Sequence, residues 1–211
     1  MVGNPLPEQG KRAIMKAKRE QEILHAAMKV FSRDGFSATD VEKIAALAKV
    51  GKGTVYRHFG NKQDLFLAVV EWGLNTLNER ILEATKDIED PIERISAAIY
   101  TYMEFFEQNR RFYRVLVQDQ SGGFRERVER EFKEKYFAHL HLLEEVLEKG
   151  MQLGIFKRMD VSSAALALVG SSNALIYKWL IADEEYPLKG EVRVIMDTFF
   201  WGIVQNACKK G

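Results

Sequence analysis

The fold of this 211-residue chain is decided by residues 31–66, which read FSRDGFSATDVEKIAALAKVGKGTVYRHFGNKQDLF. Apolar residues recur there three and four positions apart, as they do along the buried face of an α-helix. Gly35 stands where a first helix would end, because glycine readily adopts the conformation that follows a helix terminus. Short helices joined by tight turns are therefore predicted for this part of the chain.

Capping residues place the boundaries of these helices. The first helix is expected over about residues 15–34. The second starts after Thr39, a good N-cap with Glu42 as its capping-box partner. A third covers about residues 52–59, and Asn61 then caps a longer helix.

The third helix is predicted to leave polar side chains on its outer surface. If Val55 and Phe59 face inward, the outward and rim positions are Lys52, Thr54, Tyr56, Arg57 and His58. Two short helices joined by a tight turn form a helix-turn-helix, whose second helix can lie in the major groove of DNA. Phosphates and base edges are bound by donors of these types. The pattern therefore favours DNA binding.

Charge is unevenly distributed along the chain. Residues 1–62 hold 12 lysines and arginines against 6 aspartates and glutamates, whereas the remainder holds 19 against 24. A basic first part and an acidic second part suggest two different tasks, and the basic part suits a polyanion. The basic residues near the N-terminus, such as Lys11 and Arg12, either reach an adjacent minor groove or form a solvated tail.

The stretch from Phe31 to Phe66 resembles the TetR family of bacterial transcriptional repressors, and the resemblance covers about residues 20–70. With it we expect a flexible basic arm at 1–15, a helix-turn-helix DNA-binding domain at 16–64, and a helical ligand-binding and dimerisation domain at 65–211. The resemblance implies phosphate contacts from Thr39, Tyr56, His58 and Lys62. It implies contacts in the groove from Lys52, Gly53, Thr54 and Arg57, with base contacts from Lys52 and Thr54.

The turn before the third helix departs from the family's usual pattern. The family usually has glycine before the turn's valine and serine or threonine after it, whereas this chain has Lys49 and Gly51. Gly51 is a weaker cap because it has no side-chain acceptor. Either Lys49 takes a left-handed conformation at some energetic cost, or the turn differs slightly. The orientation of the third helix depends on which alternative holds.

Beyond residue 66, apolar stripes at helical spacing continue, and no alternating β-branched run demands a sheet. The expected fold class is all-α, with a three-helix helix-turn-helix domain followed by a larger helical domain. Aromatic side chains in the larger domain would suit a mainly apolar effector if some line a cavity, although core packing is the default for most. The predicted ligand-binding residues are Tyr102, Phe106, Tyr136 and Tyr177.

A homodimer is predicted from the last two helices, at about residues 160–182 and 189–208. The final helix carries more apolar surface than one core needs, including Phe199 and Ile203. The helix before it offers small residues, Gly170 and Ala174, which permit close approach of a partner helix. The family resemblance implies the same pairing, and a dimer would place two helix-turn-helix motifs on a palindromic operator.

Other classes of protein find little support in the sequence. It has no Gly-rich phosphate loop, G-x-S-x-G motif or Cys-x-x-Cys, so neither an enzyme nor a cofactor is predicted. His141 and nearby glutamates form a weak metal pattern, and no metal site is predicted. The apolar run at residues 161–177 is short for a membrane span, so a buried helix is expected and no membrane partner. The single cysteine, Cys208, and the lack of a signal-peptide pattern favour the cytoplasm.

The favoured function is a dimeric, DNA-binding transcriptional repressor that a small, mainly apolar effector releases from its operator. One alternative is a helix-turn-helix protein that binds DNA constitutively, as an activator or architectural factor, without an effector. Another is a helical small-molecule binding protein or enzyme whose N-terminal helices are only structural. Binding of the protein to its own upstream DNA, with and without cell extract, separates these alternatives.

Overall fold

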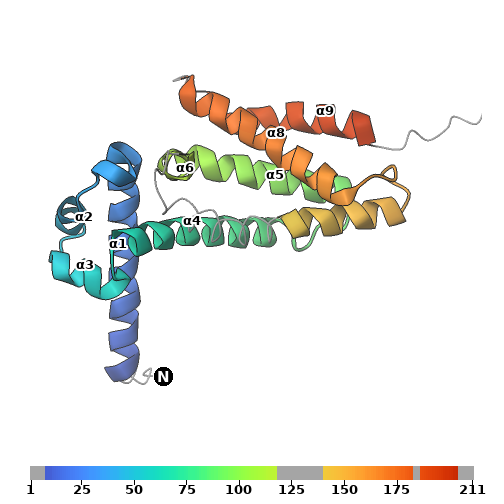
Figure 1. Cartoon of the computed structure of the whole chain (residues 1–211). Coiled ribbons are helices and arrows are strands. Elements are labelled where there is room, and N and C mark those ends of the chain that lie inside the picture. Colours follow the sequence, from blue (N-terminus) through green and yellow to red (C-terminus); the bar gives the residue numbers. More distant parts are fainter. Residues whose placement is uncertain (1–7, 118–139, 183–185, 204–211) are drawn as a thin grey trace, which may run out of the picture. The chain divides into compact units, whose positions relative to one another are not determined.

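The computed structural model describes residues 8–117, 140–182 and 186–203 (Figure 1). These residues form helices and turns without a β-strand, so the all-α class is confirmed. The chain divides into two compact units: unit 1 comprises residues 1–73 and 111–131, and unit 2 comprises residues 74–110 and 132–211. The division falls inside helix α4 (Lys62–Thr85), later than the boundary expected at residue 64.

Unit 1 begins with the long helix α1 (Glu8–Ala38), drawn in blue in Figure 1. Its helical path is interrupted at Gly35, where φ is 77° and ψ is 165°. The predicted stop at Gly35 is confirmed, because residues with a side chain very rarely take this conformation. The helix starts earlier than predicted, since residues 8–14, which the sequence assigns to an arm, are already helical.

Helix α2 (Val41–Leu47) starts one residue later than the predicted cap implies. Its N-cap is Asp40, whose carboxylate accepts a hydrogen bond from the backbone N–H of Glu42 at 2.9 Å. The prediction of Thr39 as the cap is wrong, because its hydroxyl donates backwards to the carbonyl of Gly35 at 2.6 Å. Asp40 is a better N-cap than Thr39, because the charge of its carboxylate also interacts favourably with the positive end of the helix dipole.

The turn after α2 holds Lys49 in the left-handed region, with φ at 55°. The backbone N–H of Val50 donates to the carbonyl of Ala45 at 3.0 Å, and that of Lys49 donates to the carbonyl of Ala46 at 3.1 Å. These two bonds form a Schellman motif, in which glycine is the usual residue at the position of Lys49. Of the two alternatives for this turn, the left-handed lysine is therefore confirmed.

Helix α3 (Lys52–Phe59) and the start of α4 follow this turn. Val55 is buried and anchors α3 as predicted, whereas Phe59 is only half-buried. Asn61 caps α4 as predicted, because its side-chain oxygen accepts a hydrogen bond from the backbone N–H of Asp64 at 2.9 Å. The single buried anchor leaves most of the surface of α3 open to solvent.

The core of unit 1 is rich in aromatic side chains. The ring of Phe66 lies edge-on to Phe31 and Phe36, with ring centroids 5.1 and 5.2 Å apart. The buried Phe112 of helix α6 (Arg110–Val117) packs directly over Gly73 of α4, where a side-chain carbon would lie 2.2 Å from the ring. Because Gly73 has no side chain, α6 can pack closely against α4 within unit 1.

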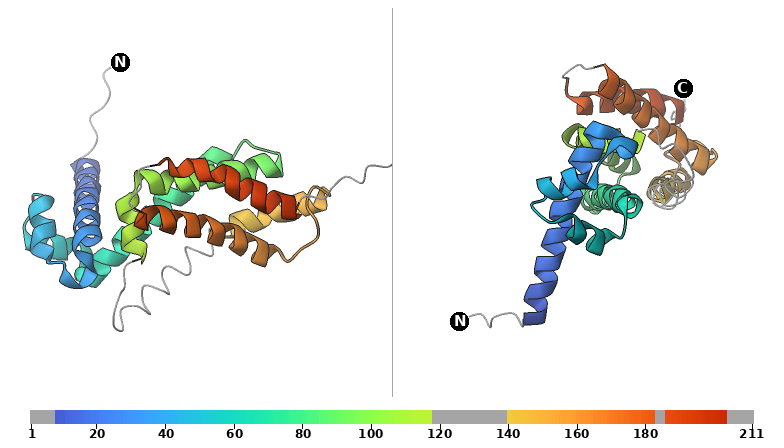
Figure 2. Two further views of the ribbon diagram at one scale, coloured as in Figure 1. Left: turned by 90° about the horizontal axis from the view of Figure 1, so that it is seen from above. Right: turned by 60° about the vertical axis from the view of Figure 1, so that its left-hand side comes forward.

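Unit 2 contains the second part of α4, α5 (Pro91–Gln108), helical residues 140–152, α8 (Val161–Ile181), the short 3₁₀-helix η1 (Leu188–Glu191) and α9 (Val192–Ile203). Helices α5, α8 and α9 pack against one another, as the views in Figure 2 show. Asp90 caps α5, since its carboxylate accepts hydrogen bonds from two first-turn backbone N–H groups, and Asp160 caps α8 by accepting one from the backbone N–H of Ser163.

Helix α8 is the one described helix that is long and apolar enough to cross a membrane by length and composition. The core helix of a soluble bundle meets the same criterion. Ala165, Leu168 and Ile176 of α8 are buried within unit 2, whereas other apolar side chains of the same helix are exposed. The helix expected at residues 161–177 is therefore buried on one face only.

Candidate DNA-binding helix and effector cavity

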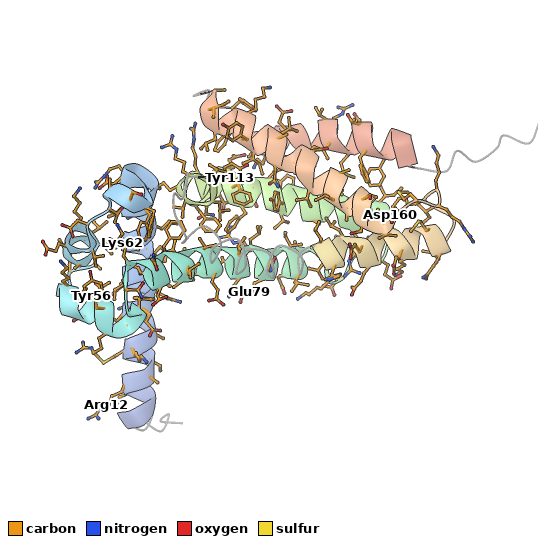
Figure 3. The ribbon with its side chains drawn as sticks, in the orientation of Figure 1. Arg12, Tyr56, Lys62, Glu79, Tyr113 and Asp160 are labelled. Carbon is orange, nitrogen blue, oxygen red and sulfur yellow. The ribbon has the colours of Figure 1, made fainter. Side chains whose placement is uncertain are left out.

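The outer surface of α3 brings together most of the residues predicted to contact DNA. Lys52, Gly53 and Arg57 are exposed, Tyr56 is 37% exposed, and Thr54 is half-buried (Figure 3 labels Tyr56). An ammonium, a guanidinium and a phenol within two turns of one helix offer the donors that bind phosphates and base edges. The outer surface of α3 is therefore suited to bind a polyanion whose grooves can accommodate a helix.

Two of these donors already have neighbours within unit 1. The ammonium of Lys52 donates a hydrogen bond at 2.8 Å to the carboxylate of Glu42 on α2, and this bond raises the pKa of Lys52. Arg57 Nη2 lies 3.4 Å from the hydroxyl oxygen of Thr54. Any anion that binds Lys52 must therefore displace Glu42, a contact that the sequence did not reveal because the two residues lie on different helices.

Gly53 has no packing role among the residues that the structure describes. It is exposed in the first turn of α3, its φ is not positive, and a side-chain carbon built on it would meet no atom within 4 Å. The N-cap of α3 is Gly51, which provides no side-chain hydrogen bond to the first turn. The start of α3 thus presents bare backbone, and backbone N–H groups at a helix N-terminus favour an anion.

Three residues predicted to contact phosphates have partners inside unit 1. Thr39 is 5% exposed, with its hydroxyl bonded to Gly35. The side chain of His58 is 9% exposed, with Nδ1 3.2 Å from the carboxylate of Glu20. The ammonium of Lys62, labelled in Figure 3, donates to the carbonyls of Ser37 and Thr39 at 3.2 and 3.0 Å. These side chains contact other parts of unit 1, and they do not lie on the exposed outer surface of α3.

Unit 2 encloses an apolar cavity of about 40 Å³. Of the predicted ligand-binding residues, Tyr102 lines it, and Phe106 is buried edge-on to Tyr102 with centroids 5.0 Å apart. Tyr177 is 50% exposed and not in the wall, and Tyr136 lies outside the described residues. The wall comes from α4, α5, α8 and residues 140–152, through Ile81, Thr85, Arg94, Ile95, Ala98, Ile99, Tyr102, Leu142, Leu143, Val146, Leu168, Val169 and Ser172.

Polar side chains are few in this wall. The hydroxyls of Thr85, Ser172 and Tyr102 each donate to an acceptor of the protein, at 2.8, 3.0 and 2.6 Å. Arg94, half-buried on α5, also lines the cavity, although it was not predicted from the sequence as a ligand-binding residue. The sequence did hold a signal for Arg94, because it precedes Ile95, a buried residue of the apolar stripe of α5. A charged residue at that position lies at the edge of the buried face of the helix.

An exposed apolar surface runs along α8. Leu166, Tyr177 and Ile181 are exposed, and Gly170 and Ala174 lie exposed between them at helical spacing. These positions recur three and four apart, so they share one face of the helix. Contiguous exposed apolar surface of this kind is typical of sites where proteins interact.

Helix α9 holds the other residues predicted at the dimer interface. Phe199 is half-buried and lies edge-on to Phe200, with centroids 5.8 Å apart. Ile203 is the last residue of α9, and its side chain is outside the described residues. Val194 adds an exposed apolar side chain to this helix.

Comparisons with known proteins match both parts of the chain. Residues 23–69 match the model for bacterial regulatory proteins of the tetR family, and residues 89–183 match that for tetracyclin repressor-like C-terminal domains. The fatty acid metabolism regulator protein of Bacillus subtilis (strain 168) is 24% identical over 192 residues, covering 90% of this chain and 98% of that protein. The transcriptional repressor NicS of Pseudomonas putida is 26% identical over 149 residues, 70% of each chain.

A solved structure has the same fold. The transcriptional regulator FadR of Bacillus subtilis, in complex with stearoyl-CoA, matches with a TM-score of 0.78 at 23% identity, covering 85% of this chain and 96% of that chain. The arrangement of helices described above, with a helix-turn-helix followed by a helical bundle, is therefore that of known regulators.

Proposed function

The chain belongs to the TetR family of bacterial regulatory proteins, and from this premise we propose that it is a repressor that a small effector releases from DNA. It is a DNA-binding regulator of transcription, as its relatives are. The observation that carries the proposal is the exposed surface of α3, where Lys52, Tyr56 and Arg57 surround a glycine that no contact within the described part of the chain requires. Because its target is chromosomal DNA, we place the protein in the cytoplasm.

In this proposal the N-terminal part of α3 enters the major groove. Lys52 and Thr54 contact base edges, and Arg57 also lies in the groove. Tyr56 donates its hydroxyl hydrogen to a phosphate, and Gly53 lets the helix backbone approach the DNA closely. Binding through phosphates makes the affinity fall steeply with salt, whereas the base contacts select the operator.

The protein acts as a homodimer in this proposal. The exposed apolar face of α8, with Gly170 and Ala174 at its centre, supports pairing through the last two helices. Two-fold symmetry presents two copies of α3 to the DNA, so the operator is palindromic, with half-sites about one helical turn apart or a multiple of it.

The effector binds in the cavity of unit 2. Its apolar wall suits a mainly apolar molecule, and the stearoyl-CoA complex of the similar Bacillus subtilis regulator supports the same class of ligand. The effector needs only to bind the DNA-free arrangement of the dimer better than the DNA-bound one. If the binding free energy of the effector differs by about 1.4 kcal/mol between the two arrangements, operator affinity changes tenfold.

The test is DNA binding by the purified chain. Fluorescence anisotropy with DNA from upstream of its own gene should show tighter binding than a scrambled duplex at the same salt concentration. Arg57→Gln should weaken the specific complex by about tenfold or more, as the loss of hydrogen bonds from a charged donor in the groove does. Arg158→Gln, which removes the same charge from an exposed site in unit 2, is the matched control and should leave it unchanged.

Equal affinity for upstream and scrambled DNA would contradict a sequence-specific regulator of its own gene. Equal losses in Arg57→Gln and Arg158→Gln would contradict the assignment of α3, because net charge alone would then explain the effect. Light scattering on the same protein should give the mass of a dimer. A monomer at every micromolar concentration would remove the basis for a palindromic operator.

A further inference from the structure

The effector cavity shares two lining residues with a second, more polar pocket. That outer pocket has a volume of about 150 Å³ and is lined by Glu89, Pro91, Arg94, Glu145, Val146 and Lys149. Arg94 and Val146 also line the apolar cavity, so they stand between the two spaces. A molecule that occupies both spaces has an apolar part inside and a polar part beside Arg94.

Arg94 is the polar side chain of the cavity wall that still lacks a partner. Thr85, Tyr102 and Ser172 already donate their hydroxyl hydrogens to protein acceptors. Arg94 is half-buried, and within the described part of the chain its guanidinium makes no hydrogen bond or ion pair. A guanidinium at the edge of an apolar cavity loses part of its hydration, so an anionic group that binds it gains more than it would in open water.

The carboxylates nearby do not neutralise Arg94. Glu89 and Glu145 are exposed, and neither lies within ion-pair distance of Arg94 or of the exposed Lys149. Both carboxylates are exposed to solvent, whereas Arg94 is half-buried and lines the cavity. The half-buried cation, rather than the exposed anions, therefore decides the charge of the ligand.

From these observations, and resting on the proposed function, we infer that the effector is an amphipathic anion whose apolar chain fills the cavity and whose carboxylate or phosphate binds Arg94. The planar guanidinium can donate two parallel hydrogen bonds to either oxyanion. Because a space of about 40 Å³ holds only a few waters, chains beyond a few carbons bind only when the wall side chains move apart. The carboxylate of a free acid and the phosphates of a coenzyme A thioester are two sources of the same chemistry.

The test is calorimetric binding to the full-length chain. The probes are saturated carboxylic acids of four, eight and sixteen carbons, the primary alcohols of the same lengths, the matching coenzyme A thioesters, and coenzyme A alone. We expect at least one acid or thioester to bind and the alcohol of equal length to bind at least tenfold more weakly. Coenzyme A alone should not bind, because it lacks the apolar chain. The preferred series identifies the anion as carboxylate or phosphate.

Variants then locate the anion. Arg94→Gln should weaken binding of the anionic probe by about tenfold to a hundredfold, as loss of hydrogen bonds to a charged group does, and should leave the weak binding of the alcohol unchanged. Arg94→Lys should recover part of the affinity, because it keeps the charge but not the planar pair of donors. Arg158→Gln, with the same change of charge on an exposed site of unit 2, should bind like the wild type.

Several results overturn this inference. They are equal binding of acids and alcohols, no binding of any amphipathic anion, an Arg94→Gln variant that binds as the wild type does, and equal losses in Arg94→Gln and Arg158→Gln. Operator binding by the ligand-free protein is measured in parallel on each variant. If operator binding is normal while the anions fail, the anionic ligand is wrong and the DNA-binding function stands. If operator binding fails, the proposed function itself is wrong.

Discussion

Replacing Gly53 with alanine should separate the stability of unit 1 from its affinity for DNA. Gly53 is exposed on α3, its φ is not positive, and an added side-chain carbon would meet no atom within 4 Å. In a helix, alanine is more favourable than glycine by up to about 1 kcal/mol, because it loses less backbone freedom on folding. No clash offsets this gain, so the variant should be more stable than the wild type.

We expect the melting temperature to rise by about 2–4 °C for a gain of this size in a chain of this length. Operator affinity should fall by about tenfold, or about 1.4 kcal/mol, because the methyl group holds the backbone of α3 away from the DNA. Both quantities are measured on one preparation at one protein concentration, since dimerisation makes the melting temperature depend on concentration. Gly190→Ala is the matched control: it also meets no atom within 4 Å, and it lies in unit 2.

A Gly53→Ala variant that melts no lower than the wild type and binds the operator as tightly would refute this reasoning, because glycine would then serve neither packing nor docking. A variant that melts several degrees lower would refute the magnitude, since it would reveal an internal contact that needs glycine. A fall in operator affinity in Gly190→Ala as well would show that the assay reports a general effect.

Three further substitutions test single contacts of unit 1. Lys49→Gly should stabilise the protein by about 0.5–1 kcal/mol in chemical denaturation, because it relieves the left-handed lysine, whereas Lys49→Ala should give no gain; equal gains would contradict the strain. Glu42→Gln should release Lys52 and make the salt dependence of DNA binding steeper by about one unit, and an unchanged slope would show that the ion pair does not compete with DNA. Lys62→Ala should lower stability by about 1 kcal/mol or more, because two carbonyls lose a charged donor, with the salt slope unchanged. A slope lower by about one unit would instead show a phosphate contact by Lys62.

Local signals in the sequence predicted the helices of unit 1 well. The stop at Gly35, the cap at Asn61 and the buried Val55 each depend on residues within one helical turn. The cap of α2 was missed because Thr39 and Asp40 are adjacent and both are good N-cap residues. Sequence spacing cannot decide between two such neighbours, and the boundary moved by one residue.

The surroundings of the DNA-contact residues could not be predicted in the same way. Helical spacing tells which side of its own helix a residue occupies, but not what another helix places against that side. Glu20 of α1 meets His58 of α3, and Lys62 reaches carbonyls before α2, so these contacts depend on how the helices cross. Tyr177 was predicted to bind the ligand but is exposed outside the cavity wall, for a related reason: α8 is apolar around most of its circumference, and the sequence does not show which apolar face is buried.

The two turns that flank α2 differ in how freely their residues can be exchanged. At Gly35 the combination of a φ of 77° and a ψ of 165° lies in a region that is essentially restricted to glycine, whereas Lys49, at a φ of 55°, is in a left-handed region that asparagine and aspartate also tolerate. In a saturation library selected for DNA binding, position 35 should therefore retain glycine alone, while position 49 accepts several residues. The residue at position 49, after α2, can therefore change during evolution, whereas the glycine at position 35, before α2, cannot.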